Sequence, residues 1–200
     1  FGALNDKHIH AWDFVDSEMV LSRFLGEEGL LLKGGELSWE LPFGMDPGFV
    51  SIFTLGYGNA RSHEDEHAHG DEEEEEETPH EGEESALEDD VWTARLMGRY
   101  RFSDFHTITA GASWAGGTNG FGRRTEVLGI DAEYLWRENG LEAGGRAFRW
   151  RNEILWRDVE AYSVHEDEGE TFRGSYDELG FYTHAIYTWN ERIDTGLRLG

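Results

Sequence analysis

The chain has 200 residues, no cysteine, and 42 acidic residues against 17 lysines and arginines, which gives a formal net charge of −25 at pH 7. The absence of cysteine excludes a disulfide framework and a thiolate metal site. Disordered acidic proteins are poor in aromatic residues, whereas this chain contains 12 Phe, 8 Trp and 7 Tyr. It has no basic stripe that would neutralise phosphates, so we expect no nucleic-acid partner.

Alternation of apolar and polar residues, which is typical of β-strands, runs through most of the chain. Residues 35–43 and 49–58 predict the first pair of strands. After residue 90 the alternation recurs in five further segments, and a last strand begins at Ile193. We therefore expect an all-β fold with about eight strands. The five segments are VWTARLMGRYRF, HTITAGASW, TEVLGIDAEYLW, RAFRWRNEILWRD and LGFYTHAIYTW.

The links between these strands alternate in length. Antiparallel neighbours place consecutive links at opposite ends of a sheet, so the short links fall on one rim and the long links on the other. This pattern predicts an up-and-down antiparallel meander with short turns on one rim and long loops on the other. The short links are 44–48, 103–105, 137–145 and 190–192, and the long ones are 61–90, 115–124 and 159–175.

The alternation is compatible with a soluble barrel or sandwich and also with a membrane barrel. The membrane barrel is favoured because arginines and acids occupy the polar positions, aromatic residues lie at both ends of the apolar stripes, and each stripe is about 9 to 11 residues long. Backbone groups in a bilayer have to be paired, so the sheet has to close, and a polar lumen favours more than eight strands. We expect residues 1–200 to be a fragment of one transmembrane β-barrel. The predicted pore-lining residues are Arg95, Arg99, Arg101, Asp131, Glu133, Arg149, Arg151 and Glu153.

A family resemblance rests on HIHAWDFVD, RFLGEEGL and GELSWELP in residues 8–42, and on LMGRYRF, GIDAEYLW, WRNEILWRDVEAY and GFYTHAIYTWNERIDTGLRLG. These segments resemble the bacterial outer-membrane barrels called zinc-regulated TonB-dependent-like receptors, a porin-like group. The resemblance covers most of the chain apart from the acidic residues between strands. It implies an outer-membrane location in contact with lipid and lipopolysaccharide, a link to zinc, and a TonB-type energising partner.

Residues 61–90 are expected to form a disordered extracellular loop. From His63 to Asp90 there are 16 acidic residues and no Lys or Arg, with six consecutive Glu at 72–77. Imidazole and carboxylate groups bind Zn²⁺, and the glutamates would raise the local cation concentration. The alternative is a solvated acidic loop whose histidines bind nothing. The candidate ligands are His63, His67, His69 and His80.

A second group of candidate metal ligands lies near the start of the chain. His8, His10 and Asp13 belong to a connection of about 25 residues ahead of the next strand. This connection is apolar enough to fold back into the pore as a constriction or gate. The alternative is a packed loop in which the three side chains make ordinary hydrogen bonds. The apolar residues of the connection are Trp12, Phe14, Phe24 and Leu25.

The sequence contains no G-x-S-x-G, H-E-x-x-H or phosphate-binding glycine motif, so we expect neither an enzyme nor a required cofactor. The leading hypothesis is an outer-membrane, porin-like protein of a Gram-negative bacterium that transports small solutes, in particular metal ions such as zinc. One alternative is a general or anion-tolerant porin, because lumen arginines favour anions. Another is a structural or binding barrel without transport, whose acidic loop only solvates the surface.

Overall fold

The computed structural model describes residues 23–25, 30–42, 47–60, 86–165 and 170–200. Eight strands form one antiparallel sheet in which each strand pairs with its neighbours in sequence. A helical turn at residues 23–25 precedes the sheet. The prediction of an all-β, up-and-down antiparallel fold is therefore confirmed. The strands are β1 (Leu32–Leu41), β2 (Phe49–Ala60), β3 (Leu87–Ser103), β4 (His106–Asn119), β5 (Arg124–Arg137), β6 (Ala147–His165), β7 (Glu170–Asn190) and β8 (Ile193–Leu199).

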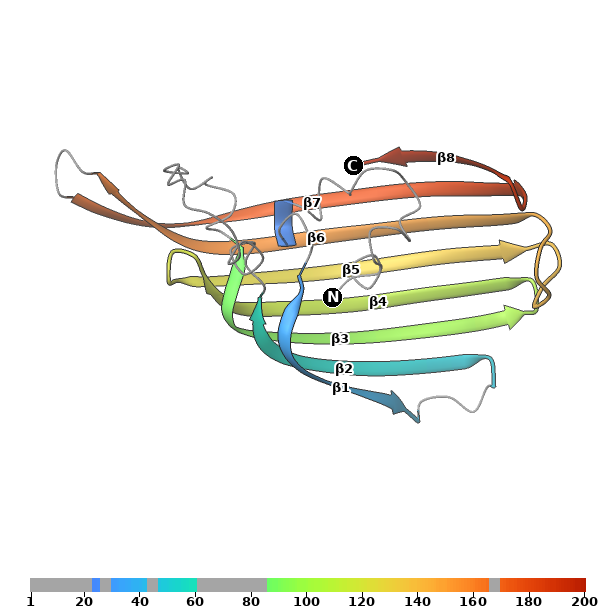
Figure 1. Cartoon of the computed structure of the whole chain (residues 1–200), viewed down its shortest axis with the longest axis horizontal. Coiled ribbons are helices and arrows are strands. Elements are labelled where there is room, and N and C mark those ends of the chain that lie inside the picture. Colours follow the sequence, from blue (N-terminus) through green and yellow to red (C-terminus); the bar gives the residue numbers. More distant parts are fainter. Residues whose placement is uncertain (1–22, 26–29, 43–46, 61–85, 166–169) are drawn as a thin grey trace, which may run out of the picture.

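The sheet is curved, with β1 and β8 at its two edges (Figure 1). Within the described ranges, β1 pairs with β2 alone and β8 with β7 alone. Closure into a barrel therefore stays a prediction. The described part of the chain contains no helix long and apolar enough to cross a membrane.

The links β3–β4, β5–β6 and β7–β8 lie at one rim of the sheet, where β1 also ends and β2 begins, as expected (Figure 1). At the opposite rim, all three long links are shorter than the sequence predicts. The predicted loop 61–90 is wrong at its end, because residues 87–90 belong to β3, and the link is 61–86. Only 120–123 separates β4 from β5, and only 166–169 separates β6 from β7. Toward this rim the side chains of the apolar face become polar, but the strands go on pairing through their backbones. The alternation of apolar and polar residues therefore ends before the strands do.

One face of the sheet, here called the apolar face, exposes large apolar side chains. Strand register aligns Ile130 with Ile154 and Phe181 in one cross-strand row. Their exposed fractions are 68%, 53% and 59%, although central residues of a sheet facing a protein core would be buried. The largest exposed residues of this face include Leu37, Trp39, Leu96, Ile108, Leu128, Ile130, Trp150, Ile154, Leu179, Phe181, Leu197 and Leu199.

Rows of different chemistry border the apolar face. Toward the long-link rim, Glu126, Asp158 and Asp177 are cross-strand neighbours that follow the last apolar row. Toward the short-turn rim, the row is aromatic. On β6 the apolar face spans the nine residues from Phe148 to Trp156. The aromatic row consists of Trp136, Phe148 and Tyr187.

A small apolar core lies on the opposite face of the sheet, near the long-link rim. Phe24 and Leu25 of the helical turn are 3% and 5% exposed, and Leu30 is buried with them. The position of Phe24 and Leu25 agrees with the expectation that the N-terminal connection folds back onto the sheet. Their buried partners on the strands are Leu87, Val91, Ala115, Val127 and Leu155.

Candidate functional site

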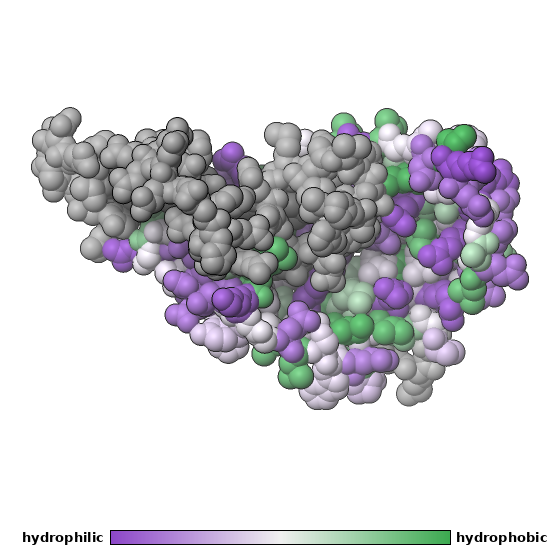
Figure 2. Space-filling view, in the orientation of Figure 1, coloured by the Kyte–Doolittle hydropathy of each residue, from purple (hydrophilic) through white to green (hydrophobic). Residues whose placement is uncertain are grey.

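The face opposite the apolar face, here called the polar face, carries charged side chains in register. Strand pairing aligns all eight residues that the sequence predicts to line a pore in neighbouring rows of this face. Figure 2 shows hydrophilic residues gathered at the rim that carries the short turns. The role of the eight residues in lining a pore stays a prediction. They are Arg95, Arg99, Arg101, Asp131, Glu133, Arg149, Arg151 and Glu153.

Arg95 forms the centre of one ion-pair cluster on the polar face. Its Nη1 donates hydrogen bonds to Asp131 Oδ2 at 2.7 Å and to Ser113 Oγ at 2.7 Å, and its Nη2 donates to Asp131 Oδ1 at 3.0 Å. Asp131 is only 3% exposed. A two-bond contact between guanidinium and carboxylate fixes both groups, so these residues join β3, β4 and β5 side by side.

Glu133 on β5 and Glu153 on β6 have separate partners on the neighbouring strands. Arg151 Nε donates to Glu133 Oε2 at 3.0 Å, and Arg149 Nε lies 4.0 Å from the same oxygen. The Tyr182 hydroxyl donates to Glu153 Oε2 at 2.5 Å. Both Glu153 and Tyr182 are 1% exposed. Buried polar groups of this kind require partners. Tyr182 supplies one for Glu153 Oε2, whereas Glu153 Oε1 has no hydrogen-bond partner among the described residues.

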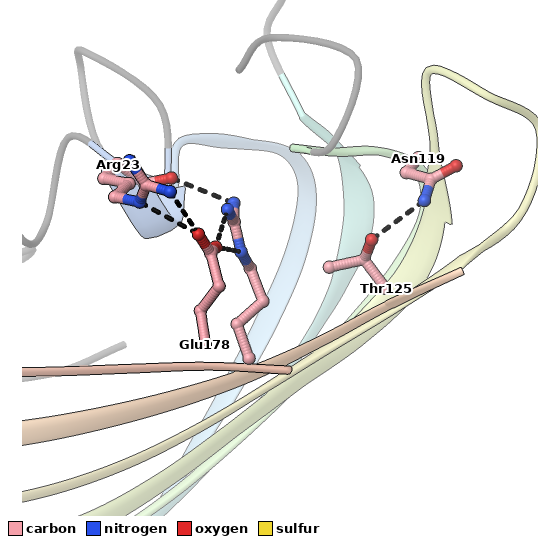
Figure 3. A network of polar contacts seen from close by, with 5 residues as sticks. Arg23, Asn119, Thr125 and Glu178 are labelled. Carbon is pink, nitrogen blue, oxygen red and sulfur yellow. Dashed lines mark hydrogen bonds and ion pairs between the residues drawn. The ribbon is translucent and has the colours of Figure 1, made fainter. Parts of the chain in front are cut away.

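Glu178 on β7 connects the helical turn to the sheet through hydrogen bonds (Figure 3). It accepts hydrogen bonds from Arg23 Nε at 3.0 Å and from Arg157 Nε at 2.9 Å. Arg157 also donates from Nη1 to the Arg23 carbonyl oxygen at 2.9 Å, and its guanidinium carbon lies 5.1 Å from the centre of the Phe24 ring. We call this arrangement the Glu178 bridge. It holds the helical turn on the polar face, beside the small apolar core.

Asn119 stabilises the tight link between β4 and β5. Its Nδ2 donates to Thr125 Oγ1 at 2.9 Å, which Figure 3 shows, and to the Glu160 carbonyl oxygen at 3.0 Å. Its Oδ1 accepts from the backbone N–H groups of Phe121 and Arg123 at 3.1 and 2.9 Å. An Asn side chain that satisfies the backbone of a turn explains why four residues are enough for this link.

The β5–β6 turn at the short-turn rim has its own ion pair. Glu138 Oε1 accepts from Arg146 Nε at 3.1 Å, and Glu138 Oε2 accepts from the Arg146 backbone N–H at 3.0 Å. The side-chain hydrogen bonds from Arg146, followed by the backbone bond, lower the pKa of Glu138 to about 2. The Glu138 carboxylate is therefore ionised at neutral pH and stabilises the β5–β6 turn through its hydrogen bonds with Arg146.

The predicted metal ligands lie outside the described residues. This applies to His8, His10 and Asp13 and to the four histidines of the acidic segment. Among the residues that the structure describes, no three His, Asp or Glu side chains gather closely enough to hold a metal ion. The acidic-segment histidines are His63, His67, His69 and His80.

The sequence patterns did not single out Arg157 or Glu178. Period-two alternation placed Arg157 on the polar side of its strand, but its partner lies 21 residues away on β7, and Arg23 lies 155 residues from Glu178. The available signal was the pair of apolar residues next to Arg23, since Phe24 and Leu25 are buried against the sheet and bring Arg23 close to it.

No family model matches this chain, and no solved structure matches it. A search of curated proteins found an uncharacterised protein of Aquifex aeolicus (strain VF5) that is 45% identical to this chain over 42 residues. The matched part is 21% of this chain and 9% of the Aquifex protein. A match of this extent shows similarity of one segment and assigns no function.

Proposed function

We propose that this chain forms part of the wall of an outer-membrane β-barrel through which small solutes pass, as in a porin. The observation that carries the proposal is that large apolar side chains are exposed while charged side chains are buried. Leu197, Leu179 and Ile130 are 80%, 73% and 68% exposed, whereas Arg151 and Glu153 are 4% and 1% exposed. A soluble protein buries its large apolar side chains and solvates its charges. A membrane barrel exposes its large apolar side chains to lipid and carries its polar and charged residues on the inner face.

The dimensions of the apolar face support the same conclusion. A strand that crosses a bilayer at a tilt needs about 9 to 11 residues, and the apolar face spans nine residues on β6, from Phe148 to Trp156. Aromatic side chains at the short-turn border match the interfacial girdle of membrane barrels. The carboxylates of Glu126, Asp158 and Asp177 at the other border fit a position beyond the hydrocarbon, where charges are solvated.

The proposal is tested by membrane fractionation and by single-channel recording of the purified full-length protein in planar lipid bilayers. We expect the protein in the outer-membrane fraction, a change of gel migration on boiling, and stepwise conductance. A soluble protein that runs identically boiled and unboiled and gives no conductance would refute the proposal in favour of a soluble barrel. Conductance-free insertion would instead favour the structural barrel without transport.

Zinc capture by the acidic segment is a second candidate function, and the sequence observation that favours it is the cluster of histidines among acids at residues 63–90. Zinc titration by calorimetry compares the protein with a variant in which His63, His67, His69 and His80 are changed to Ala. We expect the variant to lose zinc binding of modest affinity, since ordering a loop costs conformational entropy. Equal binding by both proteins would exclude the segment as the site.

A further inference from the structure

We propose that the polar face selects small anions, and that an arginine belt near the short-turn rim is the place where they bind. This inference rests on the proposed function and names its solute class. The belt occupies two neighbouring cross-strand rows of the polar face. One row aligns Arg99 with Glu133 and Arg151, and the next aligns Arg101 with Arg149. The belt consists of Arg99, Arg101, Arg149 and Arg198, which flank the buried Arg151.

Charge along the polar face is strongly uneven. The two belt rows contain five arginines and one carboxylate, that of Glu133. The three rows on the long-link side of the belt contain five carboxylates and two arginines, Arg95 and Arg157. A ring of arginines in a water-filled passage favours anions over cations. The five carboxylates are Glu36, Glu40, Asp131, Glu153 and Glu178.

Two carboxylates at the belt are already bound to arginines. Asp131 is held by Arg95, and Glu133 is held by Arg151 with Arg149 at 4.0 Å. A carboxylate already bound to a guanidinium attracts cations weakly, because the pair is close to neutral at a distance. Arg99 and Arg101 keep exposed side chains. The accessible charge of this part of the face is therefore positive.

The strand register also supplies hydroxyl groups beside the exposed arginines. Arg99 is directly opposite Thr109, and Arg101 is directly opposite Thr107, across the β3–β4 pair. A guanidinium presents two parallel N–H donors that match the oxygens of a carboxylate or phosphate, and a threonine hydroxyl adds one further donor. This chemistry points to small oxyanions such as inorganic phosphate, with chloride passing as a weaker ligand.

The experiment measures the reversal potential of the full-length protein in a planar bilayer under a KCl gradient, and the inhibition of chloride current by inorganic phosphate. We expect anion selectivity and inhibition by phosphate. The variant Arg99→Gln/Arg101→Gln should lower the chloride-to-potassium permeability ratio by about threefold or more, since two charges leave the belt. The matched control Arg124→Gln/Arg192→Gln removes two charges outside the belt and should keep the ratio of the unchanged protein.

The variant Arg99→Lys/Arg101→Lys separates charge from geometry. It should keep the anion selectivity but weaken the inhibition by phosphate, because lysine cannot make the two parallel bonds of a guanidinium. A conducting protein that prefers cations would overturn this inference and leave the proposed function intact. Equal permeability ratios in the Arg99→Gln/Arg101→Gln variant and its control would also overturn it. The absence of any conductance would overturn both.

Discussion

Arg95 on β3 and Asp131 on β5 are joined by two hydrogen bonds of 2.7 and 3.0 Å that pass over the intervening strand β4. The residue beneath this ion pair is Gly111, which is aligned with Asp131 across the β4–β5 pair. A Cβ atom at Gly111 would lie 2.7 Å from Arg95 Nη2 and 2.8 Å from Asp131 Oδ2. The glycine therefore provides the space through which the two charged side chains meet.

The substitution Gly111→Ala should separate Arg95 from Asp131. The new Cβ would displace the guanidinium, and a nearly buried carboxylate would lose at least one charged hydrogen bond. We expect the free energy of unfolding to fall by about 1 to 3 kcal/mol. Urea unfolding in lipid vesicles, followed by tryptophan fluorescence, measures the change.

Gly98→Ala is the matched control for this prediction. Gly98 lies on the apolar face of β3, and a Cβ there would meet the Phe49 ring at 3.5 Å, an ordinary contact distance. We expect a change within about 0.5 kcal/mol. Similar losses in the Gly98 and Gly111 variants would mean that the ion pair does not depend on the space above Gly111.

The strand number and the two faces could be predicted from the sequence because alternation of apolar and polar residues directly reflects the pleat of a strand. The lengths of β6 and β7 could not, since Asp158 and Asp177 lie on the outward face, where the apolar pattern has ended while backbone pairing continues. Individual ion pairs were also beyond prediction. The contact between Arg95 and Asp131 depends on the register of three strands, and a shift of one residue would move either side chain to the other face.

Loss of the Glu178 bridge should release the helical turn from the sheet. The chain has no cysteine, so Leu25→Cys introduces a single thiol at a position that is 5% exposed. Adding Glu178→Gln replaces a carboxylate that binds both Arg23 and Arg157. Charged hydrogen bonds contribute about 1.5 to 3 kcal/mol, so chemical labelling of the introduced thiol should become about tenfold faster or more.

The control for the bridge is Glu126→Gln in the same Leu25→Cys background. Glu126 pairs with the exposed Arg124 outside the helical turn, so the labelling rate should stay that of Leu25→Cys alone. In bilayer recordings, Glu178→Gln should also raise the conductance if the turn narrows the passage. An unchanged labelling rate in the Glu178→Gln variant would show that apolar packing alone holds the turn.

The β5–β6 turn should loosen in acid. Glu138 has its pKa lowered from 4.5 to about 2, chiefly by the side-chain hydrogen bonds from Arg146. A carboxylate with a lowered pKa in the folded state contributes its stabilisation fully above the unfolded value near 4.5, and this contribution is lost as pH falls through about 2. Hydrogen exchange of the Arg146 amide, which donates to Glu138, should therefore lose protection between pH 4.5 and 2. Glu138→Gln should start with lower protection and show no such change.

A charged side chain introduced on the apolar face should destabilise the protein if this face contacts lipid and should have little effect if it contacts water. Ile130 is 68% exposed and lies in the row that aligns it with Ile154 and Phe181. In a bilayer, Ile130→Arg should lower the free energy of unfolding by about 2 to 4 kcal/mol, while Glu160→Arg, beyond the carboxylate border, should cost at most about 1 kcal/mol. On a soluble protein both changes fall on an exposed surface, where substitutions stay within about 0.5 kcal/mol. Urea unfolding of both variants in vesicles measures the difference, and equal small effects would remove the support that the apolar face gives to a membrane location.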